Sequence, residues 1–341
     1  MKHLGVLWFV LMFVLNQSVT HGQVFPNYGG ERAGLSALTF LKNDINPRSV
    51  AIGGASSAIS GDAYSVISNP AALVQVGNKG FTLANKFIGA GVNQSFLSFV
   101  NPQSDETSAW GFSLNSLTSG FIKERTEFMP GGTGREFSVV NMAFGATYAK
   151  LLSEQFSFGV TLKYVYEHIA GFDNHTAAVD MAFLYKTDFK KLQFAAVLQN
   201  FGGSSSLASR DDIPVTFNRT TGVALESNPV PTVFSIGMSI EPYRVDKHSI
   251  LAAFQISHPN DNSENIRLGG EYSYDDVFFG RIGYKINVLG HVFPTAGVGF
   301  AIPTGTDQIL MMDYAISTTR FFGSQHIIGV RFMLPKNQSS R

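Results

Sequence analysis

Hydrophobic and polar residues alternate along most of the chain from about residue 80 onward. The alternation is clearest from Phe156 to Glu167, where Phe, Val, Leu and Tyr fill one set of alternate positions. Mainly Ser, Gly, Thr, Lys and Glu fill the other set. A period of two is typical of β-strands whose two faces meet different surroundings. The sequence therefore predicts an all-β protein over residues 80–334.

The chemistry of the two faces indicates what those surroundings are. The polar face is rich in Gly, Ala and Ser with scattered charges, whereas the apolar face is continuous and has Tyr near the strand ends. This arrangement is typical of a transmembrane antiparallel β-barrel, with lipid outside, a polar interior and aromatic residues at the membrane interfaces. A charge should then cost more at Leu162, on the apolar face, than at Thr161, on the polar face. A secreted soluble β-protein is the alternative.

About fourteen strands are predicted by this alternation. An even number places both ends of the barrel on one side of the membrane, and the longest connections, 120–136 and 201–230, then fall together at the opposite end. Outer-membrane barrels show this asymmetry, with short periplasmic turns and longer extracellular loops. The predicted strands are 80–87, 90–101, 108–119, 137–150, 155–168, 175–187, 191–200, 231–241, 247–257, 264–274, 277–286, 293–302, 307–317 and 324–334.

Composition agrees with an exported membrane protein. Charged residues make up 15% of the chain, against roughly a quarter in ordinary soluble domains. Lys+Arg and Asp+Glu balance at 25 each, so nothing indicates a nucleic-acid partner. Residues 1–22 read as a cleaved signal peptide, because Lys2 and His3 precede an apolar run that ends at Leu15. A permanent helical anchor is the alternative, but the run is shorter than the ~20 residues that span a bilayer.

Residues 23–79 do not alternate, and they are predicted to form a plug inside the barrel. They contain too many apolar residues for a solvated periplasmic tail, which is the alternative. Ala33 to Leu41 is predicted to form a short amphipathic helix, and the rest reads as turns around Gly53-Gly54 and Asn69-Pro70-Ala71. The barrel itself is assigned to 80–334, and 335–341 to a C-terminal tail.

Three segments resemble the PorV/PorQ family of Bacteroidota outer-membrane proteins, which belongs to the wider group of barrels similar to the fatty-acid transporter FadL. The first is Asn46 to Leu73, which contains the Asn69-Pro70-Ala71 signature of the plug. The others are Ser257 to Lys285 and Met312 to Phe332, in the family's order. Ser68 stands where the family often has an aromatic residue.

The resemblance implies a role in the type IX secretion system, in the Gram-negative outer membrane. Such barrels accompany the translocon and handle cargo that carries a C-terminal signal domain. The loops 120–136 and 201–230 are then the expected partner-binding surface. The likeness to FadL implies the alternative, uptake of a hydrophobic small molecule, and the sequence alone leaves both functions open.

No catalytic or metal-binding arrangement is predicted, so neither an enzyme nor a cofactor is expected. The eight His residues lack the spacing of a metal site. The oxygen-rich stretch His258 to Glu264 could be taken for a calcium loop, but a polar turn between two strands explains it better. Charged residues on the polar face are predicted to project into the lumen and to pair with each other and with the plug; a minority could contact a solute. They are Lys163, Glu167, Asp180, Arg267, Glu271, Arg281 and Lys285.

Overall fold

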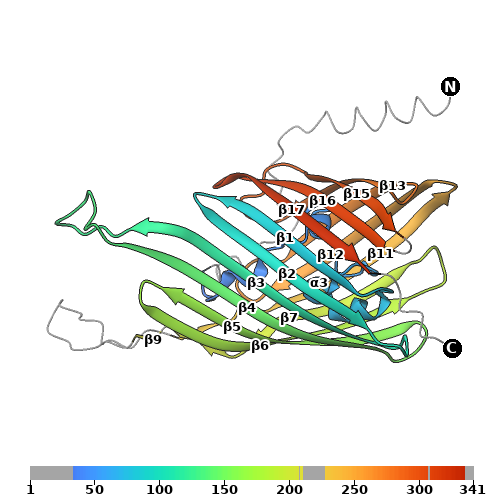
Figure 1. Cartoon of the computed structure of the whole chain (residues 1–341), viewed down its shortest axis with the longest axis horizontal. Helices are drawn as coiled ribbons and strands as arrows, with labels where there is room; N and C mark the ends of the chain where they lie inside the picture. The colour runs from blue at the N-terminus through green and yellow to red at the C-terminus, as the bar shows by residue number, and fades with distance from the viewer. Residues whose placement is uncertain (1–33, 207, 210–226, 306–307, 335–341) are drawn as a thin grey trace, which may run out of the picture.

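A computed structural model describes residues 34–206, 208–209, 227–305 and 308–334 of the chain (Figure 1). The predicted signal peptide, 1–22, and the predicted tail, 335–341, lie outside the described residues. Within them, no helix has the length and apolarity needed to cross a membrane.

Fourteen long antiparallel strands, β1 to β7 and β11 to β17, form one closed barrel. Each pairs with its neighbour in sequence, and β1 closes the barrel on β17, from Gly80↔Met333 to Phe87↔His326. The short strands β8 (Ser204–Ser205), β9 (Ala208–Ser209) and β10 (Asn228–Pro229) belong to the connection between β7 and β11. The bounds of the barrel strands are β1 Gly80–Gly89, β2 Val92–Pro102, β3 Ser108–Lys123, β4 Glu136–Leu151, β5 Phe156–Ile169, β6 Phe172–Lys186, β7 Gln193–Gly202, β11 Val233–Val245, β12 His248–Pro259, β13 Asn265–Tyr274, β14 Phe278–Ile286, β15 Thr295–Gly305, β16 Gln308–Thr319 and β17 Gly323–Met333.

The predicted fold class is confirmed, and all fourteen predicted strands are present. The main difference concerns the first long loop, because β3 continues to Lys123 and leaves a connection of 124–135. Gly120 causes the difference: it adopts φ 69 where the β3–β4 register shifts between Thr118 and Phe121. A bulge of this kind lets a strand continue past a residue that would otherwise read as a turn. The resulting β3–β4 hairpin projects beyond the other strands at one end of the barrel (Figure 1).

The two faces of the wall differ as the alternation predicts. Leu162 on β5 is 62% exposed, whereas the adjacent Thr161 is fully buried. Outward positions on the other strands carry Phe, Leu, Ile and Tyr in the same way. Inward positions carry Ser, Thr, Gly and charged residues that are buried against the N-terminal segment or against each other. The wall therefore has an apolar outer surface, and its polar groups lie inside.

The N-terminal segment, residues 34–79, forms short helices that lie within the ring of strands (Figure 1). The expected amphipathic helix from Ala33 to Leu41 is wrong for the described residues, which form only a single 3-10 turn there. Gly34 at φ 90 and Leu38 at φ 54 have left-handed backbone conformations that interrupt a helix. The helical elements are η2 Thr39–Lys42, α2 Pro47–Ala51, α3 Ser65–Ser68 and η3 Pro70–Gln75.

Glycines in the wall allow the segment to lie directly against the strands. A Cβ added to Gly283 on β14 would be 2.0 Å from the backbone nitrogen of Gly53. One added to Gly159 on β5 would be 2.3 Å from the carbonyl carbon of Pro70. Apolar packing completes the contact, with Tyr64 stacked on Phe96 of β2 at a centroid distance of 5.9 Å. The segment is thus packed against opposite sides of the barrel.

Candidate functional site: the interior of the barrel

The Asn69-Pro70-Ala71 motif connects two parts of the N-terminal segment to the wall. Asn69 is fully buried; its side-chain oxygen accepts from the backbone N–H of Ala71 at 2.9 Å, and its side-chain nitrogen donates to the carbonyl of Ser57. Pro70 occupies the first turn of η3, where its missing N–H costs nothing. The carbonyl of Ala71 then accepts from the Ser157 hydroxyl on β5 at 3.0 Å.

Six charges, five of them buried and one, Arg48, partly exposed, form a closed ring between the segment and the strands β13, β14, β16 and β17. Two of its members come from the segment and four from the wall. Neighbouring members approach to N···O distances of 2.6–3.5 Å. Arginine and carboxylate alternate around the ring, in the order Arg48, Glu271, Arg281, Asp313, Arg331 and Asp62. Because each charge has two opposite neighbours, this side of the interior is electrically balanced.

The two ring members on the segment are held in their charged forms. Burial alone would raise the pKa of Asp62, but the guanidinium groups of Arg331 and Arg48 outweigh burial and lower the pKa below its usual value. Burial would likewise lower the pKa of Arg48, yet Glu271 and Asp62 raise it above its usual value. The ring is therefore a set of true ion pairs that fix the segment to the wall.

A second buried pair lies on the other side of the barrel. Lys163 on β5 is 2.6 Å from the carboxylate of Asp180 on β6, and its ammonium also donates to the side-chain oxygen of Asn200 at 2.8 Å. Asp180 accepts from the backbone N–H of Asn200 at 2.7 Å. Glu167 lies apart from this pair and accepts from the amide of Asn174 at 3.2 Å.

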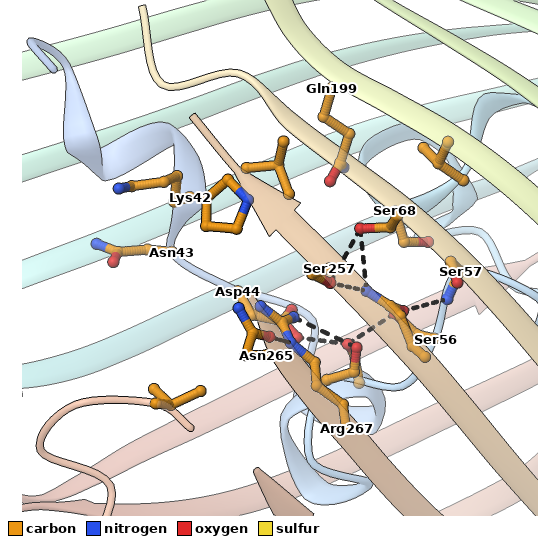
Figure 2. A pocket seen from close by; sticks show the side chains of 18 of the residues that line it. Lys42, Asn43, Asp44, Ser56, Ser57, Ser68, Gln199, Ser257, Asn265 and Arg267 are labelled. Carbon is orange, nitrogen blue, oxygen red and sulfur yellow. Dashed lines mark hydrogen bonds between the residues drawn. The ribbon is translucent and has the colours of Figure 1, made fainter. Parts of the chain in front are cut away.

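The remaining two predicted charges, Arg267 on β13 and Lys285 on β14, are directly opposite each other in the strand register. Arg267 donates to the side-chain oxygen of Asn265 at 2.9 Å and to the carbonyl of Gly54 at 3.4 Å. Arg267 also lines a cavity of about 240 Å³ between the N-terminal segment and the wall, which Asp44 lines as well (Figure 2).

The oxygen-rich stretch from His258 to Glu264 comprises the end of β12 and its connection to β13, and both of its acidic side chains contact a basic side chain. Asp261 is 2.5 Å from the ammonium of Lys42, and His258 is 2.9 Å from Glu264. These partners account for the acidic side chains of the turn.

A shallow apolar hollow of about 510 Å³ lies in the outer wall over β11 to β14. It forms where the small residues Ala252 and Gly270 are register partners on the outward face. Larger side chains, among them Met238, Phe254 and Ile282, surround it.

The structure brings together most of the charges that the strand pattern selected. Glu271 and Arg281 belong to the ring, Lys163 and Asp180 form the second pair, and Arg267 and Lys285 lie side by side, while Glu167 is separate. Four members of the ring were not among the charges that the sequence predicted to project into the lumen. Asp313 and Arg331 occupy polar positions in strands and could have been found by the same alternation. Arg48 lies in the five-residue helix α2 and Asp62 in a turn, and neither gave a periodic signal. They are brought to the wall only by folding.

No protein-family model and no curated protein matches the sequence. Solved structures do share the fold. The Pseudomonas putida toluene transporter TodX is 13% identical, with a TM-score of 0.58 over 86% of this chain and 100% of that chain. The Ralstonia pickettii toluene transporter TbuX is 13% identical, with a TM-score of 0.53 over 84% and 96%. A Pseudomonas aeruginosa FadL homologue is 11% identical, with a TM-score of 0.53 over 84% and 97%.

These likenesses define the class of protein. The chain has the fold of the FadL-like, 14-stranded outer-membrane β-barrels. Identities of 11–13% show a shared fold and no more. The neighbours are described as transporters and channels, which is consistent with a barrel that is not an enzyme.

Proposed function

We propose that this protein is an outer-membrane channel through which a hydrophobic small molecule enters the cell. The observation that carries the proposal is the match, over nearly the whole length of both chains, to barrels described as toluene transporters. This function was the alternative in the sequence analysis, and the fold supports it better than the secretion role.

Exposed aromatic and aliphatic side chains at one end of the barrel support the proposal. The connections at that end include the long ones, which are extracellular in outer-membrane barrels. Phe128 at the tip of the β3–β4 hairpin is 93% exposed, Leu289 and Phe293 in the β14–β15 connection are 84% and 60% exposed, and Phe321 between β16 and β17 is 71% exposed. Large apolar groups in water are costly, and their clustering marks a surface that contacts something apolar. We propose that they collect the solute.

The N-terminal segment is proposed to act as the plug. Its backbone lies against Gly159 and Gly283, and ion pairs join Arg48 to Glu271 of β13 and Asp62 to Arg331 of β17. A solute larger than water must therefore displace part of the segment or pass beside it. Residues 1–22 are proposed to direct export as a cleaved signal peptide, which would deliver the barrel to the outer membrane of a Gram-negative cell.

A role in type IX secretion is the second candidate. It is favoured by the three segments that resemble the PorV/PorQ family in the same order along the chain. On this hypothesis, the 124–135 connection and the chain between β7 and β11 bind translocon components or the C-terminal domains of cargo.

A deletion strain tests both candidates together. Uptake of radiolabelled toluene and of a long-chain fatty acid is measured beside the amount of cargo secreted. We expect the deletion strain to take up the solutes more slowly and to secrete the same amount of cargo. The intact gene should restore uptake fully, and a gene for the Leu289→Ser, Phe293→Ser double variant should restore it less. Lost secretion with unchanged uptake, together with recovery of translocon proteins on the tagged barrel, would favour the second candidate and reject the first.

A further inference from the structure

Two cations project inward side by side on neighbouring strands. Arg267 of β13 and Lys285 of β14 are direct register partners, so their Cβ atoms are about 4.5–5.5 Å apart. Like charges directly opposite each other destabilise a sheet. The same two strands pair Glu271 with Arg281 a few residues further along, and those two form an ion pair at 2.6 Å. The strand pair therefore accommodates one complementary pair and one repulsive pair.

A third cation, Lys86 of β1, adds to the imbalance. It is 7% exposed, and its ammonium donates to the backbone carbonyl of Asp44 at 3.2 Å. No carboxylate oxygen in the described part of the chain lies within 4.0 Å of Lys86, Arg267 or Lys285. The carboxylate of Asp44 is close enough to interact with Lys285, but it accepts from the Ser49 hydroxyl and the backbone N–H of Asn46. Three cations thus surround one carboxylate.

The nearby histidine does not offset this positive charge. His291 lies in the β14–β15 connection, where burial and then the neighbouring Lys285 lower its pKa to about 4. It is therefore neutral at pH 7. The interior consequently contains a balanced ring on one side and an excess of positive charge beside the cavity. Charges without a counter-ion inside a protein cost free energy, and inside a membrane protein they mark ion or substrate sites.

Serine hydroxyls and side-chain amides make up a large part of the lining of the cavity beside Arg267, together with several aliphatic side chains. Ser257 and Gln255 of β12 hydrogen-bond to each other at 2.9 Å on one wall, and Ser49 and Ser56 do so at 2.8 Å on the other. Figure 2 shows Arg267, Asn265 and Asp44 together at one edge of this space, with Ser57, Ser68 and Ser257 around it. Such a lining suits a ligand that makes several hydrogen bonds as well as one charge contact.

We propose that this cavity binds a small organic anion, a carboxylate or phosphate ester that also carries hydroxyl groups. Its charged group lies against Arg267, which lines the cavity, with the ammonium of Lys285 beside Arg267 in the strand register. Its hydroxyl groups bond to the serine and amide lining. The bound anion supplies the negative charge that the protein omits. The inference rests on the cation excess and the polar lining, and it is independent of the proposed path for a hydrophobic solute.

Binding to the purified, detergent-solubilised full chain tests the ligand class. Gluconate and glucose 6-phosphate are titrated calorimetrically in phosphate-free buffer, with sorbitol as the uncharged counterpart of gluconate. We expect saturable binding of at least one anion and none of sorbitol. Arg267→Gln and Lys285→Gln should each weaken binding by about tenfold or more. Lys247→Gln, which removes an exposed cation paired with Asp275, should not change it.

Three results would overturn the proposal. The first is the absence of saturable binding for both anions. The second is binding by the Arg267→Gln and Lys285→Gln variants as tight as that by the wild-type protein. The third is tighter binding of octanoate than of gluconate, because an alkyl carboxylate makes no hydrogen bonds to the hydroxyl and amide groups of the lining.

Stability without ligand provides an independent test. Removing one of two repelling cations should raise the unfolding temperature of ligand-free Lys285→Gln, whereas Arg281→Gln should lower it by opening the charge ring. Added gluconate or glucose 6-phosphate, whichever binds, should raise the unfolding temperature of the wild-type protein by more than that of Lys285→Gln. A fall in the unfolding temperature of ligand-free Lys285→Gln would show that Lys285 has a structural role and would contradict the proposal.

Discussion

The contact between the N-terminal segment and the wall can be tested with a single methyl group. Gly283 and Gly280 both lie in β14, but Gly283 faces the interior and Gly280 faces outward. A Cβ at position 283 would be 2.0 Å from the nitrogen of Gly53 and 2.1 Å from the carbonyl carbon of Ile52. At position 280 the nearest atom would be in the ring of Phe278, at 3.8 Å, which is an ordinary contact.

The expected magnitude follows from these distances. Both of the close atoms at Gly283 belong to the backbone, so no side-chain rotation can relieve the overlap. The segment must move by more than about 1 Å for the methyl group to fit, and overpacking of this kind costs typically about 1–3 kcal/mol. Gly280→Ala has no overlap, and Ala is favoured over Gly in a strand by roughly 0.5–1 kcal/mol. Gly283→Ala should therefore be clearly less stable than Gly280→Ala.

Urea unfolding in lipid vesicles measures this difference, with the folded fraction followed by the faster gel migration of the unheated barrel. The accessibility of the segment to a protease added inside the vesicles gives a second readout, because a displaced segment should be cut sooner. Equal stability and equal cleavage of the two variants would refute the close packing of residues 52–53 against β14.

Further predictions concern the membrane face, the charge ring and solubility. Leu162→Arg should lower the free energy of unfolding by about 2–4 kcal/mol if the site lies at the bilayer midplane, and Tyr166→Asp, nearer the strand end, should lower it less. Folding titrations in lipid vesicles measure both losses. A larger loss for Tyr166→Asp would contradict the assigned depths of the two residues. Arg331→Met removes a buried partner of two carboxylates and should cost about 3–5 kcal/mol by urea unfolding. Arg135→Gln, which removes an exposed ion pair with Glu124, should have no measurable effect on the free energy of unfolding. A similar loss of stability in Arg331→Met and Arg135→Gln would contradict the stabilising role of the charge ring. The protein should require detergent for extraction and migrate faster when unheated, and recovery in a soluble fraction would rule out the membrane barrel.

For one substitution, the tertiary structure changes the effect on stability that the strand pattern predicted. Alternation places Thr161 on the polar face, which suggested that a charge would be tolerated there better than at Leu162. Thr161 is in fact fully buried, its hydroxyl hydrogen-bonds to that of Thr147 at 2.8 Å, and its methyl group lies close to Gly145. Arg at this position would overpack the interior, so Thr161→Arg should also be destabilising, for reasons of volume. Periodicity identifies the face of a residue but not the space beside it.

The number of strands and the direction of their side chains were determined by the sequence alone, because a strand in a barrel wall meets lipid on one side and polar groups on the other. That local constraint repeats every two residues and is visible without any partner. It also selected Glu271 and Arg281 as inward charges, and it would have selected Asp313 and Arg331.

The partners of those charges were decided only by the tertiary structure. Arg48 comes from the short helix α2 and Asp62 from a turn, and they meet Glu271 and Arg331 because the segment folds back inside the closed barrel. The alternation likewise could not show that Lys285 faces Arg267 with no carboxylate between them, because register depends on how two strands pair and not on the pattern within either one. Pairing across strands and packing of the segment are long-range, so the sequence supplied the candidate residues and folding decided which of them lie together.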